Sequence, residues 1–146
     1  MADHVRQQIR AATADALSGA TVAGANVFKG HVYPKHLLPC LSVLTPEDEY
    51  TEEASSMGSD AFACNLVVEV CAAANADLDD LVDRLCAEVH QVLMASTTLK
   101  NLLVNLQLMG TGPIELEDEG EHPHGRARMN WVGLYSIDPG DPTSTA

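Results

Sequence analysis

Hydrophobic residues recur at helical spacing near the N-terminus and again in the middle of the chain. In residues 4–17, apolar positions such as Val5, Ile9 and Ala12 lie three or four apart, and charged or polar residues fill the other faces. In residues 77–95 the spacing is the same, and acids at the start suit the positive end of a helix dipole. Asn75 or Asp77 can cap this second helix. Its predicted core stripe is Leu78, Leu81, Val82, Leu85, Val89 and Val92.

Elsewhere the apolar residues alternate with a period of two, which is typical of strands. The clearest strand is 61–72, where one face is continuously apolar and the other carries Asn65 and Glu69. The last strand, 126–137, also alternates. Shorter elements are expected at 27–29 (with an extension to Tyr33 left open), at 38–45, at 104–109 before an interruption at 110–112, and as a helical turn at 99–103.

The order of predicted elements is helix, two strands, a long strand, helix and two strands. Two main helices packed on one face of a single mixed or antiparallel sheet form an α+β fold. One domain over residues 1–138 accounts for the chain, since domains most often have about 100–150 residues, and residues 139–146 are expected to be a loose tail. The other face of such a sheet is available to a partner.

A long acidic hairpin loop is expected at residues 46–60, directly after the apolar strand 38–45. It has six acids and no base: Glu47, Asp48, Glu49, Glu52, Glu53 and Asp60. Loops of this length in a compact domain are usually functional or disordered. Two interpretations stay open, a solvated hairpin connection and a segment that orders against a neighbouring subunit or partner. A second acidic segment is expected at 115–121.

The formal net charge is −13, from 21 acidic and 8 basic residues. Such a surface repels phosphate backbones and anionic lipid, which argues against direct nucleic-acid binding. Copies of the chain also repel one another, so salt should favour assembly by screening over about 8–10 Å. The first residues lead into no apolar run and no stretch reaches about 18 apolar residues, so we expect no secretory signal, no membrane contact and synthesis in a cytoplasm.

Candidate chemistry is sparse. His122 and His124 beside Glu121 are the best metal candidates, but Zn²⁺ sites need three or four ligands on supported elements, and this acidic segment has no cysteine nearby. The chain has no G-x-S-x-G motif for a nucleophile. We therefore expect no catalytic, cofactor-binding or metal-binding residues, and no enzyme. The cysteines lack C-x-x-C spacing and are interpreted as reduced, mostly buried hydrophobes: Cys40, Cys64, Cys71 and Cys86.

Basic residues are rare enough to be candidates for contact. Arg126 and Arg128 project from one side of the last strand, and with Lys29 and Lys35 they could meet acids of a neighbouring copy. An ordinary polar strand face is the alternative. The residues expected to contact a subunit or partner are Glu47, Asp48, Glu49, Glu52, Glu53, Arg126 and Arg128.

Several stretches, in this order, carry a resemblance to a known family: VRQQIRAA at 5–12, LPCLSVLT at 38–45, EYT at 49–51, the strand 62–70, the helix opened by DLD at 77–79, and the closing strand with Trp131 and Tyr135. The chain resembles the tail terminator proteins of long-tailed, siphovirus-type phages, which include the lambda-like minor tail protein. Residues 112–124 do not map onto the family.

The resemblance implies a structural virion protein that forms a hexameric ring on the tail tube, stops tube polymerisation and offers the head-joining surface. It implies no enzyme activity and no cofactor. The implied partners are other copies of the chain in a homo-hexamer, the tail tube protein and a head completion or neck protein. The implied location is the tail or neck of the virion, after assembly in the host cytoplasm. DNA would pass through the lumen without specific binding, and an acidic lumen would repel it.

Three alternatives lead to different observations. A head–tail joining or completion protein of the phage neck would form a ring but would not bind purified tail tubes as a terminator does. A small ligand-binding module of ferredoxin-like type would be a stable monomer or dimer with a compact pocket. A hydrolase or metal enzyme would need His122 and His124 to bind metal, which a metal analysis would reveal.

Overall fold

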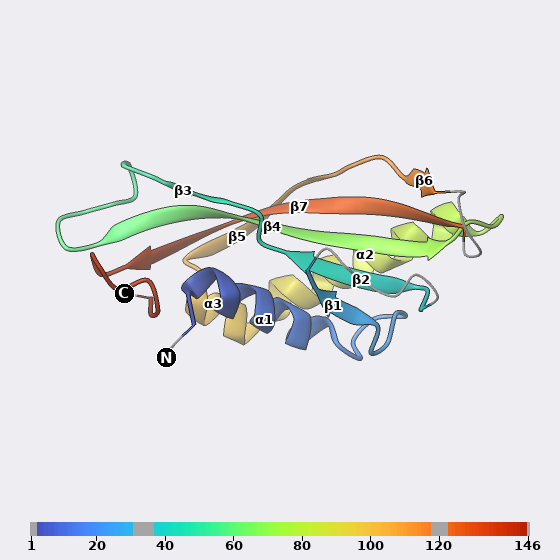
Figure 1. Cartoon of the computed structure of the whole chain (residues 1–146), viewed down its shortest axis with the longest axis horizontal. Helices are drawn as coiled ribbons and strands as arrows, with labels where there is room; N and C mark the ends of the chain where they lie inside the picture. The colour runs from blue at the N-terminus through green and yellow to red at the C-terminus, as the bar shows by residue number, and fades with distance from the viewer. Residues whose placement is uncertain (1–2, 31–36, 118–122, 146) are drawn as a thin grey trace.

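The structure is a computed structural model that describes residues 3–30, 37–117 and 123–145. Within these residues, seven strands form one mixed sheet, and three helices pack beside it (Figure 1). The sheet order is β1-β2-β4-β7-β5, with β3 paired to β4 and β6 paired to β7. The predicted α+β class is confirmed.

Two long antiparallel strands form the spine of the sheet. The strands β4 and β7 have 14 residues each and pair along their whole length, from Asp60 opposite Ile137 to Ala73 opposite His124. A different pair of strands flanks each half of the spine. The strands β2 and β6 pair with one half, and β3 and β5 pair with the other. The strands are β1 (Val27–Lys29), β2 (Cys40–Leu44), β3 (Asp48–Tyr50), β4 (Asp60–Ala73), β5 (Asn105–Thr111), β6 (Glu115–Glu117) and β7 (His124–Ile137). The molecule is therefore long, as Figure 1 shows.

Two of the helices begin at polar side chains that accept backbone hydrogen bonds. His4 Nδ1 accepts from Arg6 N at 3.0 Å, and Ser96 Oγ accepts from Leu99 N at 3.3 Å. Asp77 makes no such side-chain bond, whereas Asn75 Oδ1 accepts from Asp77 N at 3.0 Å. The helices are α1 (Val5–Leu17), α2 (Leu78–Ala95) and α3 (Thr97–Leu102), close to the predicted bounds.

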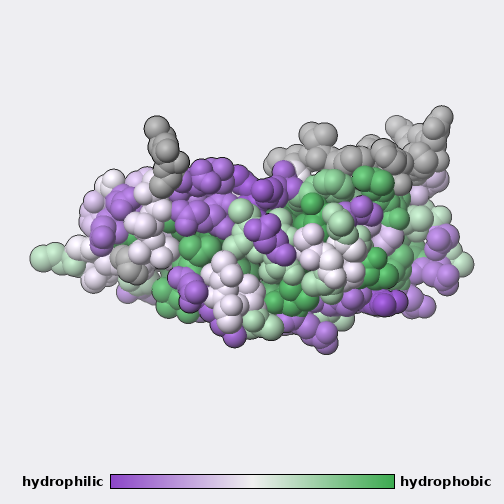
Figure 2. Space-filling view, turned by 90° about the horizontal axis from the view of Figure 1, so that it is seen from below, coloured by the Kyte–Doolittle hydropathy of each residue, from purple (hydrophilic) through white to green (hydrophobic). Residues whose placement is uncertain are grey.

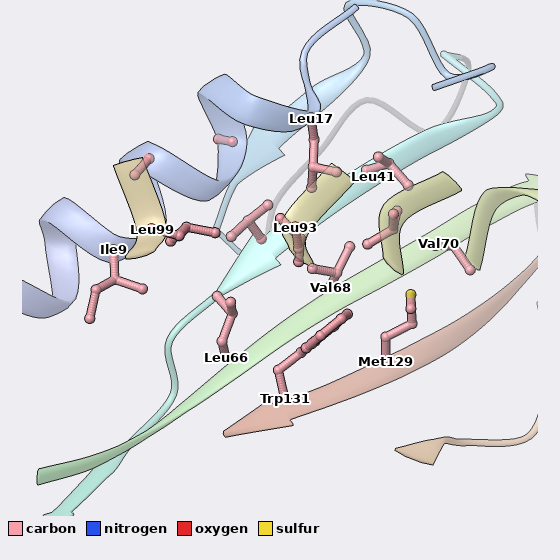
Figure 3. Close-up of a cluster of buried hydrophobic side chains, with 14 of the residues drawn as sticks. Ile9, Leu17, Leu41, Leu66, Val68, Val70, Leu93, Leu99, Met129 and Trp131 are labelled. Atoms are coloured by element: carbon pink, nitrogen blue, oxygen red, sulfur yellow. The ribbon is translucent and has the colours of Figure 1, made fainter. Parts of the chain in front are cut away.

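The core lies between the helices and the alternating apolar face of the spine. Figure 3 shows Leu66, Val68 and Trp131 of the sheet pointing toward Leu93 of α2 and Leu99 of α3. The predicted apolar faces of both long strands are thus confirmed. The predicted stripe of α2 is nearly right, because Leu81 and Val92 are only partly buried and Leu93, which was not predicted, is fully buried.

The structure adds two short strands that the sequence did not predict, one of them inside the expected loop 46–60, and it extends a third strand. Residues 46–60 contain β3, which pairs with β4, and residues 115–121 contain β6, whose Glu115 lies opposite Arg126 in β7. The strand predicted at 104–109 does not end at the expected interruption but spans Asn105–Thr111, with a register shift between Leu108 and Gly110. Acidic composition did not prevent strand formation, because the long partner strands supply backbone hydrogen bonds and, for β6, the cross-strand cation Arg126.

Two further predictions concern the ends of elements. The strand at 27 ends at Lys29, and its proposed extension to Tyr33 lies outside the described residues. In the segment after β7, Pro142 O accepts a 2.8 Å hydrogen bond from Val5 N, and Thr143 O accepts a 2.6 Å bond from the Gln8 side chain. These bonds join the segment to α1, and the domain limit at 138 stays a prediction.

Candidate interaction surfaces

The acidic segment forms an ordered hairpin that projects beyond the core. Thr51 N donates to Ala61 O at 2.9 Å, and Ala61 N donates to Ser55 Oγ at 2.9 Å. Paired backbone bonds of 2.9 and 3.0 Å between Ser56 and Ser59 close the turn. Figure 1 shows this turn, between β3 and β4, as the leftmost part of the molecule. The expected hairpin loop is therefore a hydrogen-bonded arm, and whether it contacts a neighbouring subunit stays a prediction.

One predicted contact residue of the arm, Asp48, faces its own subunit. Asp48 Oδ2 accepts a 2.5 Å hydrogen bond from the Tyr135 hydroxyl and lies 3.5 Å from Arg6 Nε. Burial, followed by this hydrogen bond and the nearby carboxylate charge, raises the pKa of Tyr135 above its usual range. The Tyr135 ring also stacks on Phe62 with ring centroids 5.5 Å apart. Asp48 thus anchors the base of the arm to α1 and β7.

The other predicted acids differ in their surroundings. Glu47 is exposed, but its Oε1 accepts a 2.8 Å bond from Asn65 Nδ2. Glu49, Glu52 and Glu53 are exposed, with no ion pair to any cation in the described residues. These three carboxylates are the part of the predicted acidic surface that is available to a partner.

The two arginines that were predicted to contact a partner already form ion pairs within the chain. Arg126 Nε lies 3.5 Å from Glu115 Oε2, and Arg128 Nε lies 3.5 Å from Glu69 Oε1. Both are cross-strand neighbours, so the sheet register creates the pairs. Their role in subunit contact stays a prediction, in competition with these internal partners.

Three other cations lack a carboxylate partner in the part of the chain that the structure describes. They are Arg10, Lys29 and Lys100, of which the sequence analysis had named only Lys29 as a possible contact residue. Arg10 Nη1 donates to Thr45 Oγ1 at 2.8 Å, which holds the guanidinium beside the end of β2. Lys35 lies outside the described residues.

Large apolar side chains are exposed at several places in the described residues, and two of these places are described here. Met57, in the turn of the arm, has a relative exposure of 104%. The second place is a groove of about 300 Å³ between the end of α2, α3 and the start of β5, beside the exposed Val104 and Met94. Figure 2, which shows the molecule from below, has hydrophobic residues in several patches between hydrophilic ones. Neither place was predicted from the sequence. An apolar residue between Ser56 and Gly58, in a turn, could have indicated the first of them.

The histidine and cysteine positions give no group of three metal ligands among the described residues. His124 is buried in β7 with Nε2 3.2 Å from Glu117 Oε2, and His122 lies outside the described residues. Cys40 and Cys71 are opposite each other in β2 and β4, and the hydrogen bond between them and burial raise the pKa of Cys40. None of the four cysteines is part of a disulfide in the described residues. No helix in the described ranges is long and apolar enough to cross a membrane.

Comparisons with known proteins identify no family for this chain. No family model matches the chain, and no curated protein matches it. One chain of a solved structure, the virion of native gene transfer agent (GTA) particle, is similar over 92% of each chain, with 16% identity and a TM-score of 0.36. A similarity at this level carries no argument about function.

Proposed function

We propose that this protein is a structural component of a phage-type virion, a tail terminator that forms a hexameric ring on the tail tube. The proposal starts from the resemblance in the order of elements. It places the protein in the tail or neck, with other copies of the chain, the tube protein and a head completion protein as partners. It assigns no catalytic role and no cofactor.

The observation that carries the proposal is the separation of two different exposed surfaces. The arm projects with Met57 and the free carboxylates Glu49, Glu52 and Glu53, while the apolar groove and Lys100 belong to the α3 region. A contact between two different patches is head-to-tail, and such contacts close into rings when the rotation between copies allows it. A net charge of −13 also suits a ring through which DNA passes without binding.

The test combines imaging with a tube-binding assay. Purified protein is imaged by negative stain across protein and salt concentrations, alone and with purified tail tubes of the cognate phage. We expect six-fold rings and end-bound density on tubes that then fail to elongate. Rings that ignore tubes would favour the head–tail joining alternative, and a monomer that neither assembles nor binds tubes would refute the proposal.

A further inference from the structure

The turn of the arm presents one methionine to solvent in a fixed direction. The backbone bonds between Ser56 and Ser59 close a tight turn, and Gly58 adopts a φ of +85°, which glycine accepts without strain. Met57 therefore stands at the tip with its whole side chain exposed. Leaving a large apolar side chain in water forgoes the free energy of its burial, so this position is suited to a contact.

The groove has the size and lining for such a side chain. Leucines of α2, α3 and β5 form its floor, and its volume of about 300 Å³ lies at the lower end of the range for ligand sites. Val104 and Met94 at its side are 70% and 44% exposed, so apolar surface there is also uncovered.

The charges around both surfaces are complementary. Lys100 is the one charged residue among the described residues that line the groove, and it has no carboxylate partner in the described chain. Glu52 and Glu53 are exposed on the arm a few residues from Met57. An apolar tip flanked by acids matches an apolar groove that contains a base, and both belong to this chain.

The arm of one molecule does not reach its own groove. The start of β5, Asn105, is opposite Leu134, which pairs with Ala63 of β4. Met57 lies six residues farther out along the arm, or about 20 Å at the rise of a strand. Since the arm is hydrogen-bonded along its length, it does not fold back, and the complementary groove is that of another copy.

We propose that Met57 of one copy inserts into the groove between α2, α3 and β5 of the next copy, with Glu52 or Glu53 beside Lys100. This inference rests on the proposed function, because it supplies the head-to-tail contact that a ring requires. It names the occupant of the groove as a second copy of this chain. A small apolar ligand or a different protein in the groove are outcomes that would contradict it.

The direct test is directional cross-linking with two differently tagged single variants. Met57→Cys and Val104→Cys proteins are mixed at concentrations that give rings and treated with a short thiol-reactive cross-linker. We expect a dominant cross-link between the two tags, mapped by mass spectrometry to positions 57 and 104. The matched control replaces Val104→Cys with Leu116→Cys, an apolar residue of 61% exposure on β6 away from the groove, and should give background cross-linking.

A second measurement uses charge and size at the same contact. Met57→Asp should raise the protein concentration at half-assembly at least about ten-fold, since it removes one apolar anchor, while Met57→Leu should keep it near that of the original chain. Lys100→Glu should weaken assembly, and the double change Glu52→Lys and Glu53→Lys should restore it. Position 57 is fully exposed, so thermal unfolding of the variants should match the original protein.

The outcomes separate the inference from the proposed function. Rings that form normally from Met57→Asp protein, or that cross-link only between two copies of position 57, would overturn the inference and leave the tail terminator proposal intact. A chain that forms no ring and binds no tube would refute both.

Discussion

Asp48 illustrates how neighbouring acids can have different roles. It lies in a run of acids that look equivalent in the sequence. In β3, however, its side chain lies against the Tyr135 hydroxyl and Arg6. A short hydrogen bond to a carboxylate is stronger than one between neutral groups. The adjacent Glu49 points away and is exposed. Alternation along β3 therefore divides the acidic run into a structural part and a surface part.

We predict that Tyr135→Phe lowers the free energy of unfolding by about 1–3 kcal/mol, because it removes a hydrogen bond to a charged group while keeping the ring. The matched control is Tyr50→Phe, since Tyr50 is 51% exposed and its ring packs edge-on against Phe62. The control should change stability by no more than about 0.5 kcal/mol. Urea unfolding monitored by circular dichroism measures both, and equal effects would contradict the role assigned to the Asp48 bond.

The thiols provide a second prediction at this scale. Burial raises the pKa of Cys64 and of Cys86 to about 11, from an ordinary value of 9.0. The reactive species is the thiolate, so at pH 8 each should be alkylated about a hundred-fold more slowly than a free thiol. Cys86 is only half-buried and should react before Cys64. Mass spectrometry after timed iodoacetamide treatment, with and without urea, tests this; equally fast labelling of Cys64 in the native protein would contradict it.

At the scale of elements, close packing between β7 and the residue that follows α3 depends on a glycine. A Cβ at Gly133 would lie 2.8 and 2.9 Å from the two Cδ atoms of Leu103, which is buried. The absence of a side chain there lets the segment between α3 and β5 lie directly on the spine. This contact also forms one wall of the groove, since Leu103 lines it.

We predict that Gly133→Ala destabilises the protein by about 1–2 kcal/mol through overpacking, since Leu103 must move. Gly112→Ala is the matched control, because its added Cβ would meet only Arg128 O at 3.8 Å, an ordinary contact. The control should lie within about 0.5 kcal/mol of the original protein. Thermal unfolding measures both, and a neutral Gly133→Ala would show that Leu103 relaxes without cost.

The sequence predicted the elements that bury a continuous apolar face and missed those that do not. The faces of β4 and β7 and the bounds of α1 and α2 follow from periodicity, because burial of apolar residues decides them. The strands β3 and β6 are three residues long and acidic, and they exist because β4 and β7 extend far enough to pair with them. Such tertiary pairing overrides local preference and has no signature within the segment itself.

Only part of the candidate interaction surfaces could be predicted from the sequence. Exposure of Glu49, Glu52 and Glu53 agrees with the expected acidic surface. The internal pairing of Arg126 and Arg128 depends on register with Glu115 and Glu69, which the sequence does not specify. The groove is formed by three elements that meet only in the folded chain, so no local pattern indicates it.

At the scale of the whole molecule, two electrostatic effects oppose each other in assembly. Each copy carries a formal charge of −13, so neighbouring copies repel one another broadly. The proposed contact adds attraction between Lys100 and one or two acids, which at an exposed site amounts to about 0–1 kcal/mol. The repulsion between many like charges is larger than the attraction within this one exposed pair. The burial of Met57 in the proposed contact does not depend on charge.

We therefore predict that the assembled fraction at fixed protein concentration rises with salt, because the screening length falls from about 10 Å at 0.1 M to about 3 Å at 1 M. Sedimentation velocity across this range measures it. The control is the double variant Asp15→Asn with Asp80→Asn, which removes two exposed acids distant in sequence from the arm. Because its copies repel one another less, it should assemble more readily at low salt, and its assembly should depend less on salt. Dissociation of rings by salt would instead mean that ion pairs dominate the contact. In that case Met57→Leu and Met57→Asp would differ little, whereas Lys100→Glu would abolish assembly.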